Sequence, residues 1–314
     1  MRHSYLTRIL IFCSLALAHI SCSELLPGQV GTDETGCSNI CNDSTMIIGC
    51  DNRVARPDDI DSTTEEPWSF IGAFDPIGCT GTLIGDRFVL TAAHCLQNQG
   101  KGQLGFALAQ KARAESQRPF GTNGVRRVFV PTAYQDSNDE IDQAFDFAIA
   151  ELWEPIEGAT PAVWGHVDWD ILRFKPVFTA GYPGTQPDNG FNGRPWITEG
   201  NYASEQPFGW IDNGESGLLY TNLDGSGGQS GSPVYSLLTP SQHDEDAVIV
   251  RKINGVLIGS PVAACLADEV WVARLTPAAV AHIENTMSPD TVDPFWTVIE
   301  LPMSPTTGPD EDWP

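Results

Sequence analysis

The sequence predicts an all-β protein built from antiparallel strands, and three observations support this fold class. Glycine (30) and proline (23) are frequent among the 314 residues while charged residues make up only 18%, a balance that is typical of turn-rich β proteins. Short apolar runs alternate with turn residues at a spacing that suits antiparallel barrels rather than β-α-β units. Only one stretch has the periodicity of a helix. Apolar residues reach 41%, enough for a substantial core.

The expected strands fall into two groups. The first group lies between Trp68 and Leu152 and contains Ser69–Phe74, Gly81–Ile84, Phe88–Leu90, Val125–Val130 and Phe145–Leu152. The second group contains Val177–Ala180, Trp196–Thr198, Leu218–Leu223, Pro233–Ser236, Val248–Ile258 and Val270–Leu275. The one expected helix runs from Thr276 to Met287, with Pro277 tolerated in its first turn.

The first residues are predicted to be an export signal. Arg2 and Arg8 precede an apolar run, and Ala16-Leu17-Ala18 is a small-x-small cleavage site, which makes 1–18 the signal peptide. As an alternative, Ser21-Cys22 ends a lipoprotein signal over 1–21, and a lipid on Cys22 then tethers the protein to the cell envelope. We expect 19–46 to be a linker or propeptide and 47–287 the folded domain.

The last segment, 288–314, has six acidic residues, six prolines and no Lys or Arg, which predicts a flexible acidic tail. Within it, Phe295–Ile299 is apolar enough to pack as an extra strand. The whole chain carries a formal net charge of −24, so nucleic acid is excluded as a partner because a polyanionic surface repels phosphate.

Three motifs point to one chemistry. A histidine, His94, follows an apolar run and small residues in Thr91-Ala92-Ala93-His94-Cys95. Glycines flank a serine in the run 225–233, Gly-Ser-Gly-Gly-Gln-Ser-Gly-Ser-Pro, where the N–H groups of Gly228 and Ser230 are expected to form an oxyanion hole. A carboxylate, Asp146, heads the expected strand at 145–152.

The order of these residues matters more than any one motif. A serine hydroxyl needs a hydrogen-bonded base, and the base needs an orienting carboxylate. The order His94, Asp146, Ser230, with gaps of 52 and 84 residues, differs from that of α/β-hydrolases and subtilisins. The sequence therefore predicts a Ser-His-Asp triad of the His-first type.

The chain resembles the trypsin-like serine proteases, and within them the bacterial glutamyl-endopeptidase branch. The resemblance covers about Ile47 to Met287 and is carried by the runs 47–53, 79–85, 91–95, 181–184 and 224–233. It implies two perpendicular six-stranded β-barrels with the active site between them, and a Cys79–Cys95 disulfide. It also implies a serine endopeptidase with protein or peptide substrates. Together with the export signal this predicts a secreted enzyme, and we expect a monomer.

Position 229 departs from the animal trypsins. It is Gln, where they have the Asp that captures the new N-terminal amine after activation. Because a neutral side chain cannot form that ion pair, we expect the trypsin activation switch to be absent. We still expect proteolytic maturation near Ile47 or Ile48, where the resembling enzymes begin.

The expected substrate-binding residues are Asp224, Leu257 and Gly259. Leu257 stands where the glutamyl branch carries a pocket-wall His, in the run 255–260 that also contains Gly259, so a preference for Glu is in doubt. Asp224 lies six residues before Ser230, at the spacing of the trypsin acid that binds Arg or Lys. Two readings of Asp224 stay open: a pocket base, or a structural role in the loop.

The remaining cysteines and histidines show no metal-ligand spacing, and no cofactor is expected. In an exported chain the cysteines are expected to form disulfides, with Cys37–Cys41 and Cys50–Cys265 as hypotheses. The alternative function is a catalytically silent protease homologue that acts as a surface or extracellular binding protein.

Overall fold

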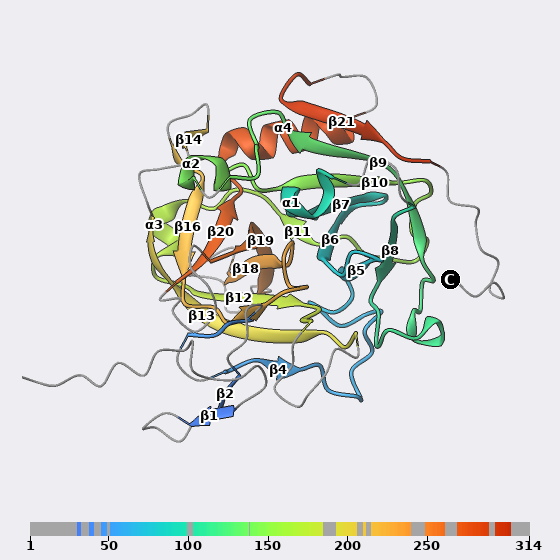
Figure 1. Ribbon diagram of the computed structural model, residues 1–314, viewed down its shortest axis with the longest axis horizontal. Coiled ribbons are helices and arrows are strands. Elements are labelled where there is room, and N and C mark those ends of the chain that lie inside the picture. Colours follow the sequence, from blue (N-terminus) through green and yellow to red (C-terminus); the bar gives the residue numbers. More distant parts are fainter. Residues whose placement is uncertain are drawn as a thin grey trace, which may run out of the picture.

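The computed structural model describes residues 30–32, 38–40, 45–48, 51–98, 103–137, 139–184, 193–205, 210–211, 215–239, 249–260, 269–288 and 293–302. These residues form a mostly β structure, in which two large sheets lie side by side (Figure 1). The fold class predicted from the apolar runs is confirmed in this form: one closed six-stranded barrel and a second antiparallel sheet, with a short helix near the C-terminus.

The first sheet closes on itself. Its strands are β5 (Ile71–Asp75), β6 (Thr80–Gly85), β7 (Phe88–Thr91), β8 (Gly105–Leu108), β9 (Asn123–Pro131), β10 (Ala148–Leu152) and β21 (Trp296–Glu300). They pair in the order β10-β7-β6-β5-β8-β9, and β9 also pairs with β10, so six strands form a barrel. The seventh, β21, adds to β9 with Val298 opposite Phe129.

The second sheet follows along the chain. Its strands are β4 (Val54–Ala55), β11 (Val163–Trp164), β12 (Pro176–Gly181), β13 (Trp196–Glu205), β16 (Leu218–Thr221), β18 (Pro233–Leu238), β19 (Val250–Gly259) and β20 (Val270–Arg274). They pair in the order β11-β19-β18-β12-β13-β16-β20, with β4 on β13, and β19 also pairs with β20. The two-residue strand β11 runs parallel to β19, and the other pairs are antiparallel.

The smaller elements are helices of one to three turns and two- or three-residue strands. The helices are α1 (Ala93–Leu96), η2 (Glu115–Gln117), α2 (Glu140–Gln143), α3 (Trp169–Leu172) and α4 (Pro277–Met287). The short strands are β1 (Val30–Thr32), β2 (Ser38–Ile40), β3 (Thr45–Met46), β14 (Trp210–Ile211), β15 (Glu215–Ser216) and β17 (Gly225–Ser226). Of these, β3 pairs with β17, which brings the segment before Ile47 to the predicted nucleophile loop.

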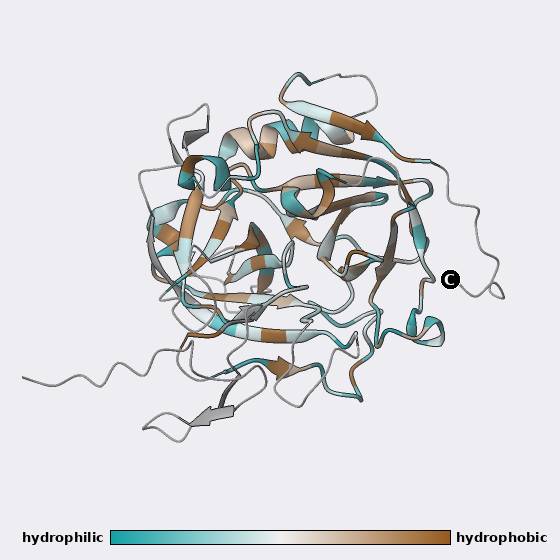
Figure 2. Cartoon of the chain, in the orientation of Figure 1, coloured by the Kyte–Doolittle hydropathy of each residue, from teal (hydrophilic) through white to brown (hydrophobic). Residues whose placement is uncertain are grey.

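Most strands are buried on both faces, and their apolar side chains form the core. Apolar residues mark the strands of both sheets, whereas the loop around η2 is hydrophilic (Figure 2). The larger core cluster includes Ile71, Leu83, Val89, Phe106 and Ile149, all with no exposed surface. Burial of such side chains is worth about 1.5–3 kcal/mol each and is the main term that stabilises the barrel.

Most of the expected elements are present. Each expected run contains a strand, and the helix begins at Pro277 with Thr276 as its N-cap, whose side chain accepts from the Ala279 N–H. The extra strand expected over Phe295–Ile299 is confirmed as β21. The sequence reasoning missed β8, a four-residue strand that starts at a glycine.

No helix among the described residues has both the length and the apolar character that a bilayer crossing requires. The predicted signal, most of 19–46, the end of the acidic tail and cysteines 22, 37, 41, 50 and 265 lie outside the described residues.

Candidate active site

His94 and Asp146 form the best-defined part of the site. His94 lies on α1, directly after β7, and Asp146 lies two residues before β10, the strand that pairs with β7. The His94 Nδ1 atom is 2.7 Å from Asp146 Oδ2, and the His94 backbone N–H donates to Asp146 Oδ1 at 2.9 Å. Because a carboxylate only accepts hydrogen bonds, Nδ1 carries the proton and Nε2 is left as the basic atom.

Burial and charge set the protonation of His94. The Asp146 side chain is only 2% exposed, while the His94 side chain keeps 29% of its surface. Burial of the ring disfavours the imidazolium, but the hydrogen bond and the negative charge of Asp146 outweigh it, so the pKa of His94 is raised above 6.5. A raised pKa makes Nε2 a stronger proton acceptor.

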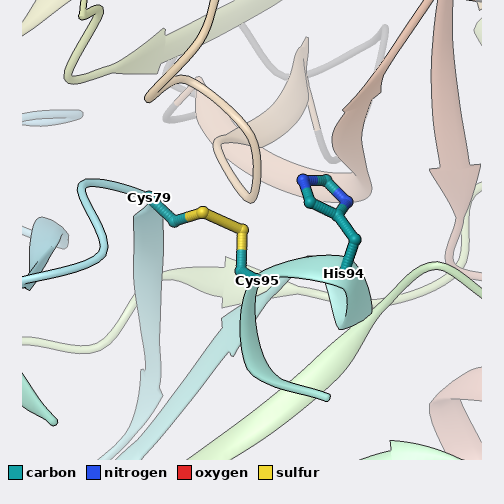
Figure 3. Close-up of side chains that lie close together, drawn as sticks. All are labelled: Cys79, His94 and Cys95. Carbon is teal, nitrogen blue, oxygen red and sulfur yellow. A yellow bond between two sulfur atoms is a disulfide. The ribbon is translucent and has the colours of Figure 1, made fainter. Parts of the chain in front are cut away.

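A disulfide fixes the turn that carries this histidine. Cys79 precedes β6 and Cys95 follows His94, and the two are bonded, as the resemblance implied (Figure 3). The two sulfurs and a ring nitrogen of His94 lie within 4.8 Å of one another. Because the sulfurs are bonded to each other, neither is a thiolate that binds metal ions, and we interpret the group as structural.

The loop that carries Ser230 is held against the first barrel. Thr80 on β6 donates its backbone N–H to the Ser230 carbonyl at 2.9 Å, and its hydroxyl donates to the Gly228 carbonyl at 2.8 Å. A Cβ at Gly231 would stand 2.2 Å from the Thr80 carbonyl and 3.1 Å from the Ala92 nitrogen. The backbone of Ser230 therefore lies at the corner from which α1 and His94 project.

The backbone of this loop adopts conformations that favour glycine. Gly228 has φ +93° and Gly231 has φ +84°, values that side chains rarely tolerate. Within the described part of the chain, no acceptor is found for the N–H groups of Gly228 and Ser230. Both residues keep some exposed surface.

Asp224 is not open to a substrate side chain. It has no exposed surface, and its two carboxylate oxygens accept the backbone N–H groups of Ile48 and Asn52, each at 2.8 Å. Burial raises the pKa of Asp224 to about 6, although the two hydrogen bonds act in the opposite direction. These contacts favour the structural role in the loop over the pocket base.

The other two expected substrate-binding residues differ from each other. Leu257 is fully buried in the second core cluster beside Leu223 and Val272, and its backbone bonds Gly231 and Ser232. Gly259, at the end of β19, has open space where a Cβ would point. Leu257 thus supports the nucleophile loop through its backbone, whereas Gly259 borders open space.

Thr80 and Arg53 are the residues of the site that the sequence reasoning missed. Thr80 is completely buried and connects the Tyr182 N–H, the Gly228 carbonyl and the Ser230 carbonyl. Arg53 is buried against the nucleophile loop. The signal for Thr80 was its place beside Cys79, and that for Arg53 was its place in the run 47–53 that carries the family resemblance.

Comparison with known proteins identifies the family. The profile of the trypsin-like peptidase domain matches residues 79–238, just over half of the chain. The chain belongs to the trypsin-like peptidase family. This trypsin-like peptidase is 31% identical over 193 residues to the glutamyl endopeptidase of Bacillus licheniformis, with 60% of this chain and 54% of that protein aligned.

A second relative is serine protease 23 of Bos taurus, 26% identical over 230 residues, with 66% of this chain and 56% of that protein aligned. The chain thus spans little more than half the length of these curated relatives.

Solved structures confirm the fold. A Glu endopeptidase in complex with MPD aligns with a TM-score of 0.58 at 20% identity, covering 77% of this chain and 99% of that one. A scabies mite inactivated protease paralogue aligns with a TM-score of 0.52 at 17% identity, covering 71% of this chain and 96% of that one. The second likeness shows that this fold also occurs in a protein described as inactivated, so activity must be argued from the residues of the site.

Proposed function

We propose that this trypsin-like peptidase is a serine endopeptidase with His94, Asp146 and Ser230 as its triad. The observation that carries the proposal is the buried His94–Asp146 pair, with its Nδ1 to Oδ2 distance of 2.7 Å. This pair does for the imidazole what a triad requires, because it fixes the tautomer and stabilises the imidazolium. The hydrogen bond from Thr80 to the Ser230 carbonyl supports the placement of the nucleophile beside it.

The proposed reaction has two balanced halves. The Ser230 hydroxyl attacks the scissile carbonyl carbon while His94 Nε2 takes the hydroxyl proton, and the N–H groups of Gly228 and Ser230 stabilise the oxyanion. His94 then gives that proton to the leaving amine as the C–N bond breaks, which leaves an acyl-enzyme. In the second half, water attacks the ester carbonyl carbon while His94 takes a proton from the water. The bond between the acyl carbon and Ser230 Oγ then breaks, His94 returns the proton to Ser230 Oγ, and the carboxylic acid product leaves.

We propose that the second sheet closes into a second six-stranded barrel, which the pairing of β19 with both β18 and β20 supports.

We also propose that the protein is exported and monomeric. The Cys79–Cys95 disulfide supports export, since such bonds persist in oxidising compartments. Lipidation of Cys22 is the alternative location, an envelope tether.

The hydrogen bonds of Asp224 bear on which substrate residue is preferred before the scissile bond. A basic preference would need the Asp224 carboxylate, and both of its oxygens are already bonded to Ile48 and Asn52. The relative from Bacillus licheniformis is a glutamyl endopeptidase, and we therefore propose an acidic preference. Leu257 supplies no imidazole, so the cation or donors for that acid must come from elsewhere.

An activity probe tests the central proposal. A fluorophosphonate is expected to label the processed protein at Ser230, and peptide hydrolysis is expected to be lost in Ser230→Ala. The matched control is Ser137→Ala, which changes a serine in a surface loop and should leave labelling and hydrolysis unchanged. Correctly folded protein that neither labels nor hydrolyses peptides would instead support the silent binding homologue.

A further inference from the structure

Arg53 is a cation buried directly behind the nucleophile loop. Its side chain has no exposed surface, and its guanidinium pairs with Asp51 through two nitrogens, at 3.0 Å and 2.8 Å. The Asp51 carboxylate also accepts the Arg53 backbone N–H at 3.1 Å. This pairing offsets the cost of burying the charge and sets the direction of the guanidinium fork.

The remaining nitrogen of the fork reaches the loop. Arg53 Nη1 donates to the Ser226 hydroxyl at 2.9 Å and to Gln229 Oε1 at 3.2 Å. Both acceptors are fully buried. One guanidinium therefore contacts both ends of the four-residue turn 226–229.

That turn is closed by reciprocal hydrogen bonds. The Gln229 backbone N–H donates to the Ser226 carbonyl at 2.9 Å, while the Ser226 backbone N–H donates to Gln229 Oε1 at 3.1 Å. Gln229 Oε1 is thus shared by Ser226 and Arg53. Since Gly228 lies inside the turn with φ +93°, the direction of its N–H depends on how the two ends are held.

Neighbouring contacts anchor the same segment to the loop a second time. Asp224, two residues before Ser226, accepts the N–H groups of Ile48 and Asn52. Ile48 and Asn52 therefore contact the loop at Asp224, and Arg53 contacts it at Ser226 and Gln229. The loop is fixed from both of these sides, without the acid at position 229 that trypsins use.

We propose that Arg53 is a positioning residue for the oxyanion hole. It holds Ser226 and Gln229 so that the N–H groups of Gly228 and Ser230 converge on one point. The neutral Gln229 accepts a hydrogen bond from Arg53, a permanent cation of the chain. In trypsins the acid at this position pairs with an amine released by cleavage. This inference rests on the proposed function, and it assigns the residue that completes the site.

The test begins with Arg53→Lys. Lysine keeps the charge beside Asp51 but lacks the planar fork that serves three acceptors at once. We expect kcat to fall by roughly tenfold to hundredfold, with KM changed by less than about twofold, because loss of one oxyanion donor costs about 100-fold or more. The matched control is Arg56→Lys, since Arg56 is also buried but donates to the carbonyls of Pro57 and Ile60. Its kcat should stay within about twofold of the unmodified protein.

A second variant covers the case in which Arg53→Lys does not fold. Gln229→Met removes the shared acceptor and leaves the Arg53–Asp51 pair intact. We expect a similar fall in kcat, and no further loss beyond about twofold when the two substitutions are combined, because residues that act through one contact are not additive. Losses that multiply in the double variant would overturn the proposal.

Hydrogen exchange separates this proposal from the proposed function. In Arg53→Lys, the amides of 226–231 should exchange at least about tenfold faster, whereas those of β5 to β7 and the melting temperature should change no more than in Arg56→Lys. Unchanged exchange in 226–231 would overturn the positioning role even if the enzyme is active. If the unmodified protein neither labels at Ser230 nor hydrolyses peptides, the proposed function fails, and the exchange result still decides whether Arg53 holds the loop.

Discussion

The Ile48 backbone N–H donates a hydrogen bond to Asp224 Oδ1 at 2.8 Å. The second carboxylate oxygen is used in the same way by Asn52. Asp224 lies at the spacing from Ser230 that suggested a pocket base. Its two hydrogen bonds instead connect the nucleophile loop to the residues that precede β4. Two predictions depend on this contact.

The first concerns specificity. In Asp224→Asn, an amide NH₂ must face one of two N–H donors, so the contact to Ile48 or Asn52 is lost, at a cost of about 1–3 kcal/mol. The ratio of kcat/KM for Arg and Glu substrates should stay the same, because the carboxylate does not bind the substrate side chain. Cleavage profiling of the two proteins checks this. A selective loss of Arg cleavage in the variant would restore the pocket role.

The second concerns stability and pH. The pKa of Asp224 is raised to about 6 from 3.8 by burial, so the folded protein binds its proton more tightly than the unfolded chain does. The stabilising effect of that proton is complete below pH 3.8 and is lost as the pH rises through about 6. The loss amounts to about 3 kcal/mol.

Urea unfolding of the unmodified protein and Asp224→Asn at several pH values measures this effect. The difference in free energy of unfolding should move by about 3 kcal/mol in favour of the variant between pH 3.5 and pH 7. A difference that does not vary with pH would mean that Asp224 titrates normally.

A third prediction concerns the base. Asp146→Asn removes the charge that raises the pKa of His94 and replaces one of the two acceptor oxygens with an NH₂ donor, and kcat is expected to fall by about 10⁴. In the unmodified protein, the acidic limb of kcat/KM should have its midpoint above pH 6.5, because His94 must lose its proton to act as a base. The midpoint should move to lower pH in the variant. Asp142→Asn, a nearby acid that accepts the Gln135 and Ser137 N–H groups, is the control and should leave the midpoint in place.

A fourth prediction concerns the C-terminal segment. Phe295 stacks on Phe147 with ring centroids 6.1 Å apart, and Trp296 meets the same ring edge-on at 5.8 Å. Phe145 also contacts Phe295, so these aromatic rings pack against both neighbours of Asp146. Truncation after Ser288 should therefore lower the free energy of unfolding by about 3–5 kcal/mol or more, the cost of removing one large buried aromatic side chain.

Two truncated chains make the comparison. Ending the chain after Pro302 keeps β21 and its aromatic residues, and we expect the melting temperature and kcat to be unchanged. Ending it after Ser288 should lower both, with the fall in kcat explained by displacement of Asp146. Equal stability of the two truncated chains would show that β21 contributes nothing to the fold.

Much of the fold was readable from local pattern. The apolar run at 88–90 and the alternating run at 145–152 contain strands that are buried along nearly their whole length, and α4 begins at Pro277 because Thr276 caps it. The disulfide was implied by the resemblance carried by the motifs around Cys79 and His94, and the structure has it. Short strands such as β8 were missed because four residues carry too little periodicity.

Within the site, the sequence alone determined the family and the residue types: a histidine after an apolar run, an acid before a strand, and a serine among glycines. Only the tertiary structure decided their partners. It paired His94 with Asp146, used both oxygens of Asp224 for backbone amides, and placed Arg53 behind Gln229. These contacts join residues 52 to 176 positions apart, and such distant pairing is set by barrel closure rather than by any local pattern.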